Sequence, residues 1–159
     1  SYVVLGCADR SAYVYDLRRM ESPVTVFSGH SRTVTYARFE GGGTRVVSSS
    51  VDGCHKMWDL NGGQEIRAFR GHRNERSFVG MDVSRNGGLI GCGSESNEVF
   101  VYDLRWGEPI WVEQFGQDED GGFVSAVCWR EVGEGECELV VGGSNGVVKI
   151  FVGRRKQMQ

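Results

Sequence analysis

The chain reads F-S-G-H at 27–30, T-V-T-Y-A-R-F at 33–39, V-V-S-S-S-V-D-G at 46–53 and K-M-W-D-L at 56–60, and the parts of this stretch return elsewhere. Its Gly29-His30 pair comes back as Gly71-His72, 42 residues later. Its Trp58-Asp59-Leu60 ending is echoed by Tyr15-Asp16-Leu17, 43 residues earlier, and by Tyr102-Asp103-Leu104, 44 residues later. The sequence is therefore a series of repeats of nearly constant length.

A unit that starts with Gly-His, ends with an aromatic residue and Asp, and recurs every ~40–45 residues is typical of a blade in a WD-repeat β-propeller. We therefore predict an all-β fold, which also suits 24 glycines beside only 2 prolines. We expect blades at about residues 1–28, 29–70, 71–116 and 117–153, followed by a basic and polar tail at 154–159. Because about three and a half blades cannot close a ring, we interpret the chain as the C-terminal part of a longer, seven-bladed propeller.

Alternating apolar residues between turn residues place the strands of each blade. The strands are expected at 2–7, 12–16 and 24–27; 34–39, 45–50, 54–58 and 65–69; 78–83, 89–93, 98–102 and 110–115; and 123–129, 138–142 and 147–151. Hairpin turns are expected at Asp9-Arg10, Gly41–Gly43, Asp52-Gly53 and Asn86–Gly88. The last blade lacks an outer strand and the first opens within a blade. We therefore expect the chain on its own to expose sheet edges and half of an apolar core, and either to aggregate or to need its missing half.

Composition and charge argue against several kinds of function. No run approaches the ~18 apolar residues of a membrane-spanning helix. The net charge of -3 argues against a nucleic-acid-binding surface. The five cysteines form no C-x-x-C pair, so we interpret them as buried, reduced thiols. A metal site at Cys54 or His55 is not expected, because the usual ligand spacing is absent, and we predict no cofactor and no metal.

One group of residue types looks catalytic. His30, Asp52 and either Ser48 or Ser50 supply the types of a Ser-His-Asp triad. In WD blades these types, together with the aromatic residue at Trp58, instead form a buried hydrogen-bond chain, and a buried polar network is tolerated when each member has a partner. Partial copies recur in the neighbouring repeats, as Asp9 with Tyr15 and His72 with Tyr102. A nucleophile is not expected to recur with each blade, so we predict a structural network that includes His72, and no catalytic site.

Two charged segments allow two interpretations each. Arginines gather near one blade junction, at Arg67, Arg70, Arg73 and Arg76. They are either solvated surface or a contact for an acidic partner. The acidic loop at 116–122 is either a plain surface loop or a contact for a partner.

Several longer segments are more specific than the blade pattern. Residues 6–18, 27–36, 69–80, 91–103 and 123–130 resemble a group of plant WD-repeat proteins in light signalling. The group comprises the constitutive photomorphogenesis ubiquitin ligase, the suppressors of phytochrome A and the repressors of UV-B photomorphogenesis. Within it, residues 85–93, 105–112 and 152–156 are most similar to the repressors of UV-B photomorphogenesis.

This resemblance implies a non-enzymatic interaction propeller of the nucleus and cytoplasm. Such a protein would bind the UV-B photoreceptor, promote its return to the inactive dimer and so repress UV-B signalling. The ligase of the group reads a Val-Pro-containing peptide across its propeller mouth, and the matching positions here are Arg32, Glu75 and Phe78. An aromatic wall gives Val-Pro an apolar contact, and flanking charges orient the peptide.

The resemblance also implies partners in ubiquitin ligation. Two segments are similar to the W-D-x-R box by which substrate receptors dock on the adaptor of cullin–RING ligases, with Tyr in place of Trp: Tyr15-Asp16-Leu17-Arg18 and Tyr102-Asp103-Leu104-Arg105. An alternative function is therefore a substrate receptor of a cullin–RING ligase. A further alternative is the propeller half of the photomorphogenesis ligase or of a suppressor of phytochrome A. The sequence upstream of Ser1 would distinguish these from a repressor.

Overall fold

The computed structural model describes residues 1–86, 88–116, 121–133 and 136–154, and in this part of the chain it forms four antiparallel sheets. In each sheet neighbouring strands follow one another in sequence. The first two sheets contain β1 (Tyr2–Gly6), β2 (Ser11–Asp16) and β3 (Thr25–Ser28), then β4 (Val34–Phe39), β5 (Arg45–Ser50), β6 (Cys54–Asp59) and β7 (Glu65–Phe69). The last two contain β8 (Met81–Val83), β9 (Leu89–Gly93), β10 (Glu98–Asp103) and β11 (Pro109–Gln114), then β12 (Val124–Gly133), β13 (Glu136–Gly143) and β14 (Val148–Arg154).

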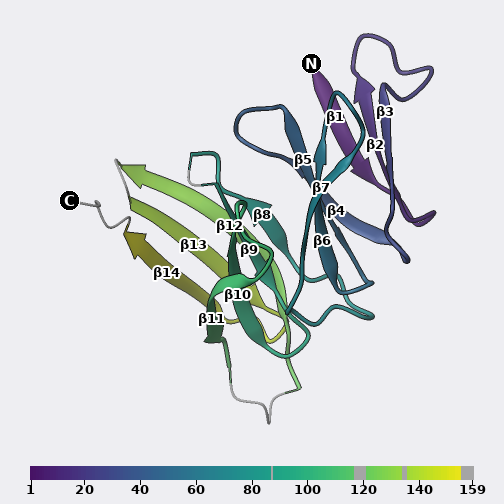
Figure 1. Ribbon diagram of the computed structural model, residues 1–159. Coiled ribbons are helices and arrows are strands. Elements are labelled where there is room, and N and C mark those ends of the chain that lie inside the picture. The colour runs from purple at the N-terminus through teal and green to yellow at the C-terminus, as the bar shows by residue number, and fades with distance from the viewer. Residues whose placement is uncertain (87, 117–120, 134–135, 155–159) are drawn as a thin grey trace.

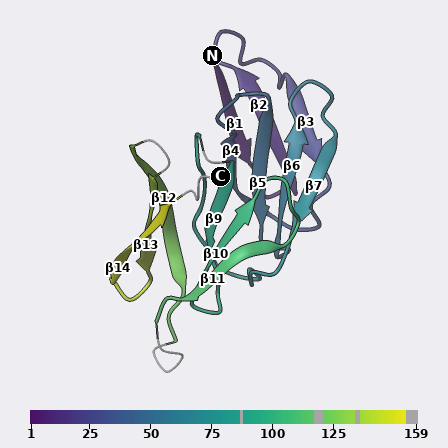
Figure 2. The same ribbon diagram turned by 60° about the vertical axis from the view of Figure 1, so that its left-hand side comes forward.

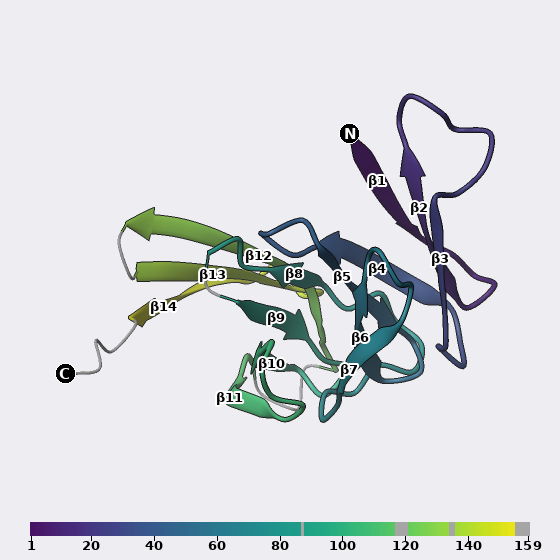
Figure 3. The same ribbon diagram turned by 45° about the horizontal axis from the view of Figure 1, so that its top comes forward.

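The sheets follow one another through space in chain order. The N-terminal sheet lies at one end and the C-terminal sheet at the other (Figures 1 and 3). In the turned view, the β12–β14 sheet stands beside β9–β11, and the first two sheets lie beyond (Figure 2). The all-β prediction is confirmed for the described residues, none of which forms a helix long and apolar enough to cross a membrane. The exact blade and tail limits stay a prediction.

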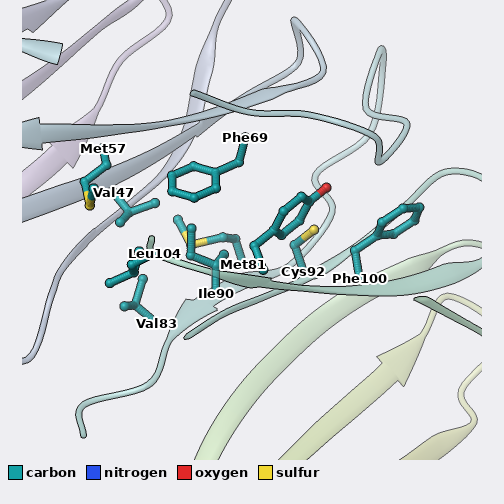
Figure 4. Packing of buried hydrophobic residues seen from close by; sticks show 10 residues of the cluster. Val47, Met57, Phe69, Met81, Val83, Ile90, Cys92, Phe100 and Leu104 are labelled. Carbon is teal, nitrogen blue, oxygen red and sulfur yellow. The ribbon is translucent and has the colours of Figure 1, made fainter. Parts of the chain in front are cut away.

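Each pair of neighbouring sheets buries its own apolar cluster. Between the second and third sheets, Val47, Met57 and Phe69 face Met81, Ile90 and Cys92 (Figure 4). Similar clusters lie between the first and second sheets and between the third and fourth. Fully burying one such aliphatic or aromatic side chain contributes about 1.5–3 kcal/mol. The fold is therefore stabilised by contacts from each sheet to the next, as expected for propeller blades.

Glycine permits close approach at the third junction. A Cβ on Gly93 would lie 2.3 Å from the carbonyl oxygen of Val124, and one on Gly80 would lie 2.5 Å from the backbone nitrogen of Val127. These positions therefore let β12 pack backbone to backbone against the inner strands of the third sheet.

The prediction that a strand begins at Phe78 is wrong. β8 covers only Met81–Val83, where Met81 pairs with Cys92 of β9. The backbone N–H groups of Glu75, Arg76 and Ser77 instead donate to the Glu95 carboxylate. The chain is therefore held as a loop before β8, and Phe78 is exposed rather than packed inward.

The fourth sheet is longer than expected. β12 was predicted to end at Trp129, but it continues as Arg130 pairs with Glu138 of β13. β14 was predicted to end at Phe151, but it runs on to Arg154, whose guanidinium forms a 3.0 Å ion pair with Glu136. Arg154 is thus a strand residue. Residues 155–159 and most of the acidic loop, 117–120, lie outside the described residues.

The outer strand of the fourth sheet carries an apolar stripe. Val148, Ile150 and Val152 are 65%, 57% and 63% exposed. They alternate along β14, whose intervening Phe151 contacts Trp111 of the third sheet. The expected exposed apolar surface is present, whereas the expected aggregation stays a prediction.

Candidate functional site

Four side chains of the second sheet form a connected polar chain. His30 Nδ1 lies 2.9 Å from Asp52 Oδ2, and His30 Nε2 lies 2.8 Å from Ser48 Oγ. The indole N–H of Trp58 donates to the same Ser48 Oγ at 2.8 Å. Ser48 is completely buried and shares its hydroxyl with two neighbours, so it has no access to a substrate. The arrangement ties the loop before β4 to β5 and β6.

Asp52 ends this chain and stabilises the nearby loop. Burial works to raise the pKa of Asp52, but the contacts with His30 and with the backbone N–H groups of Ser31 and Cys54 outweigh it and hold the pKa below its ordinary value. Ser50, the other predicted serine, binds the same loop: its hydroxyl accepts the backbone N–H of Asp52 at 3.1 Å and donates to the Arg32 carbonyl at 3.0 Å.

The third sheet holds an altered copy of this network. His72 contacts the Tyr102 hydroxyl through its backbone N–H at 3.2 Å and through Nδ1 at 3.1 Å. Burial lowers the pKa of His72 to about 4 and raises that of Tyr102 above its ordinary range. No hydrogen bond among the described residues joins His72 to the polar chain of His30. Together with His55 and Cys92, it forms a group of possible metal ligands.

Two of the three predicted mouth residues share a pocket. A hollow of about 320 Å³ lies between the loops that precede and connect strands of the second sheet and the loop that leads into β8. Its lining consists of Ser31, Arg32, Val51, Asp52, Gly53, His72, Arg73, Asn74 and Glu75. Arg32 donates to the Val51 carbonyl at 3.1 Å, and Glu75 forms a 3.6 Å ion pair with Arg73. Phe78 does not line this hollow; it lies three residues beyond Glu75 and is 63% exposed.

Glu95 organises the loop that carries these residues. Its Oε1 accepts the backbone N–H groups of Glu75, Arg76 and Ser77 at 3.0, 2.6 and 2.6 Å. Burial works to raise the pKa of Glu95, but these N–H groups outweigh it and lower the pKa. The sequence showed Glu95 only as part of the segment 91–103, because a contact with residues about 20 positions away has no local signal.

Asn74 supplies an unusual polar group to the pocket. Its side chain is completely buried, and neither amide atom has a hydrogen-bond partner among the described residues. Buried amides normally have partners. Both amide atoms are shielded from solvent, so they do not face a ligand in this arrangement of the pocket.

The two predicted adaptor-docking segments have the same geometry. The guanidinium of Arg18 bridges both carboxylate oxygens of Asp16, at 2.6 Å for the shortest contact, and Arg105 does the same with Asp103 at 2.6 Å. These contacts lower the pKa of Asp16. Both arginine side chains are 75% exposed. Tyr102 is completely buried, so it supports its corner from within, whereas Tyr15 is half-buried.

Arg105 also borders a larger hollow. This space of about 830 Å³ lies between the third and fourth sheets, where Arg105 and Arg154 bring positive charge beside Glu131 and Glu136. Nothing in the sequence indicated this hollow, because β12 and β13 extend beyond their predicted ends to form it.

Comparison with known proteins agrees with this architecture. The sequence model of the WD domain, G-beta repeat, matches residues 21–59. WD repeat-containing proteins RUP2 and RUP1 of Arabidopsis thaliana are each 52% identical to the chain, over 97% and 98% of it and over 43% and 41% of their own lengths. E3 ubiquitin-protein ligase COP1 of Pisum sativum is 38% identical over 96% of the chain and 23% of its own length.

The chain therefore spans less than half the length of these relatives. Among solved structures, the computationally designed Ika4 protein has a TM-score of 0.74 at 24% identity, over 94% of this chain and 84% of that one. This likeness concerns the fold alone. The chain belongs to the WD-repeat β-propeller proteins, in the light-signalling group that its sequence indicated, and it is more similar to the RUP proteins than to COP1.

Proposed function

We propose that the protein is a non-enzymatic interaction propeller of the nucleus and cytoplasm that represses UV-B signalling. It binds the UV-B photoreceptor and promotes its return from active monomer to inactive dimer. One observation supports this most: Arg32 and Glu75, which come from loops of different sheets, line the same pocket. The 52% identity to RUP2 and RUP1 supports the same assignment within the group.

The pocket suits a short extended peptide with a Val-Pro core. Its volume of about 320 Å³ is at the lower end of the ~300–1,000 Å³ range of ligand pockets. Arg32 and Glu75 present opposite charges to residues that flank the Val-Pro core. Phe78 provides an exposed apolar surface on the same loop. A proline-fixed segment loses little conformational entropy on docking, so a small pocket suffices.

The chemistry is differential binding. A partner that binds the dimer-competent state of the photoreceptor more tightly shifts its population towards the dimer, and no bond is made or broken. The photomorphogenesis ligase would compete for the same Val-Pro tail.

A peptide titration tests this function. The Val-Pro peptide of the photoreceptor tail is titrated into the protein by calorimetry, and wild type is compared with Phe78→Ala. Loss of an aromatic anchor costs on the order of 2 kcal/mol, or about thirtyfold in affinity. Trp106→Ala is the matched control, because Trp106 is 58% exposed and lies on the β10–β11 connection instead. Saturable binding that Phe78→Ala leaves unchanged would place the peptide elsewhere.

A second function is supported by the two adaptor-docking segments at residues 15–18 and 102–105. Two exposed guanidiniums with the same Asp–Arg geometry favour docking on the adaptor of a cullin–RING ligase. The double variant Arg18→Ala, Arg105→Ala should abolish adaptor pull-down and leave peptide binding unchanged. Retained pull-down by this variant would leave only the photoreceptor role.

A further inference from the structure

Three side chains from two sheets converge in the core of the second junction. His55 comes from β6, His72 from the loop between β7 and β8, and Cys92 from β9. Each offers a ligand atom, and these atoms all lie within 4.8 Å of one another. The side chains are 0%, 4% and 0% exposed, so the group is shielded from solvent.

The ring nitrogens of this group lack partners. Three buried ring nitrogens have no hydrogen-bond partner among the described residues: Nδ1 and Nε2 of His55, and Nε2 of His72. The two rings stack with centroids 4.0 Å apart and planes 5° apart. Buried polar side-chain atoms nearly always have a partner, and the exceptions call for an explanation such as an ion.

The repeat itself explains how these residues come together. Cys92 precedes Tyr102 by the same ten positions by which Ser48 precedes Trp58. The strand registers agree, since Ile90 pairs with Tyr102 as Val46 pairs with Trp58. A thiol therefore stands where the second sheet has the hydroxyl that joins its histidine to its tryptophan.

His55 is the added member. It has no counterpart in the polar chain of the second sheet, and from β6 it reaches across the junction to stack on His72. Two imidazoles and one thiol have thus replaced an ordinary network of one imidazole and one hydroxyl.

We propose that His55, His72 and Cys92 form a three-ligand site for a d10 metal ion, Cu⁺ or Zn²⁺, that links the second sheet to the third. Imidazole and thiolate are the ligands that select these ions, whereas hard ions such as Mg²⁺ require oxygen. The nearly parallel rings tilt apart on binding, because a nitrogen lone pair lies in the plane of its ring.

Tyr102 acts as a positioning residue for this site. Its hydroxyl oxygen lies 3.1 Å from Nδ1 of His72 and can accept a hydrogen bond from a protonated Nδ1. The lone pair of the ring is then on Nε2, the nitrogen that has no other partner. Metal-ligating histidines commonly donate their other ring N–H in this way, which fixes the tautomer.

Charge favours Cu⁺ over Zn²⁺. Cys92 binds the ion as a thiolate, and its proton is released to the solvent. One thiolate then neutralises Cu⁺, whereas Zn²⁺ with the same ligands keeps a net positive charge inside an apolar cluster, and the group contains no carboxylate. Structural Zn²⁺ sites also have four protein ligands, and the residues that the structure describes supply only three here.

Metal titration of the purified protein tests the proposal. Chelator-stripped protein is titrated anaerobically with Cu⁺ against a chromogenic competitor, and separately with Zn²⁺. We expect one high-affinity Cu⁺ equivalent per chain, and X-ray absorption of that complex should show both nitrogen and sulfur ligands. His55→Leu and Cys92→Ser should each weaken binding by about a hundredfold or more, and Tyr102→Phe by about tenfold to a hundredfold.

Matched variants keep the result interpretable. Cys92→Ser gives the third sheet the hydroxyl that Ser48 supplies at the equivalent position of the second sheet, so the variant should fold. Its metal-free melting temperature checks this. Cys54→Ser removes another buried thiol that is not in the group and should leave binding unchanged. One equivalent of Zn²⁺ lost in the same variants would support the site and overturn the choice of ion. Binding retained in both His55→Leu and Cys92→Ser, or absent from wild type, would overturn the site.

Discussion

The carboxylate of Glu95 accepts the backbone N–H of Ser77 at 2.6 Å, together with those of the two preceding residues. A single side chain between β9 and β10 thereby fixes the loop that carries both Glu75 and Phe78. The loop that carries these two proposed peptide-binding residues is therefore held by a residue that does not line the pocket.

Replacing Glu95 should therefore weaken peptide binding, although Glu95 does not line the proposed peptide pocket. Glu95→Gln keeps the shape but removes the charge from three hydrogen bonds, and a charged hydrogen bond contributes about 1.5–3 kcal/mol. We expect roughly tenfold weaker binding of the Val-Pro peptide by calorimetry. Glu113→Gln, at an exposed position on β11, is the control. Unchanged affinity in Glu95→Gln would show that the loop keeps its shape without this contact.

The polar chain of the second sheet should carry a large part of the stability. Ser48→Ala leaves the buried ring nitrogen of His30 and the indole N–H of Trp58 without their shared partner. Each unsatisfied buried group costs about 1–3 kcal/mol, so we expect the free energy of unfolding in urea to fall by about 2–6 kcal/mol. Ser28→Ala, which removes an exposed hydroxyl, should change it by less than about 0.5 kcal/mol. Equal effects of the two variants would contradict a structural role for the chain.

Asp52 should make the stability of wild type depend on acid. Its pKa is lowered in the folded state, so the stability that it contributes is present above its unfolded pKa of about 3.9 and is lost as the pH falls through the folded value. Asp52→Asn lacks this contribution. In urea unfolding, the variant should be clearly less stable at pH 7, and the gap should narrow below about pH 4. A gap of constant size down to pH 2 would assign the effect to shape and not to charge.

The close approach at Gly93 should tolerate no side chain. Gly93→Ala places a methyl group 2.3 Å from the carbonyl oxygen of Val124, so β12 must move away from β9. Overpacking of this kind costs about 1–3 kcal/mol or more, and we expect a matching loss in unfolding free energy. Gly133→Ala is the control, because no described residue other than its chain neighbours has an atom within 4 Å of its added Cβ. A variant at Gly93 as stable as wild type would mean that the junction adapts freely.

The repeat pattern predicted most of the fold, because it is carried by local alternation and turn residues. The predicted bounds of β4, β5, β7 and β9 agree with the structure residue for residue. The start of β8 could not be predicted in the same way. Phe78 reads as a strand residue by its neighbours, and only the distant carboxylate of Glu95 holds the segment as a loop.

The candidate sites divide along the same line. Repeat positions identified His30, Ser48, Asp52 and Trp58, whose contacts lie within one sheet. The stacking of His55 on His72 joins two sheets, and His55 occupies a position that the repeat leaves variable. Ligand spacing in sequence gave no signal, since the three residues of that group are 17 and 20 positions apart.

The twin Asp–Arg corners have a consequence for the strength of adaptor docking. Arg18 follows β2 and Arg105 follows β10, which are equivalent strands of the first and third sheets, whereas the second sheet has Asn61 at the matching place. An exposed ion pair alone contributes little. A partner long enough to reach both corners gains avidity, because the first contact raises the effective concentration for the second. The adaptor would then have to contact Arg18 and Arg105 at the same time, across the second sheet that lies between them. The spacing of the repeats would therefore contribute to the specificity of docking.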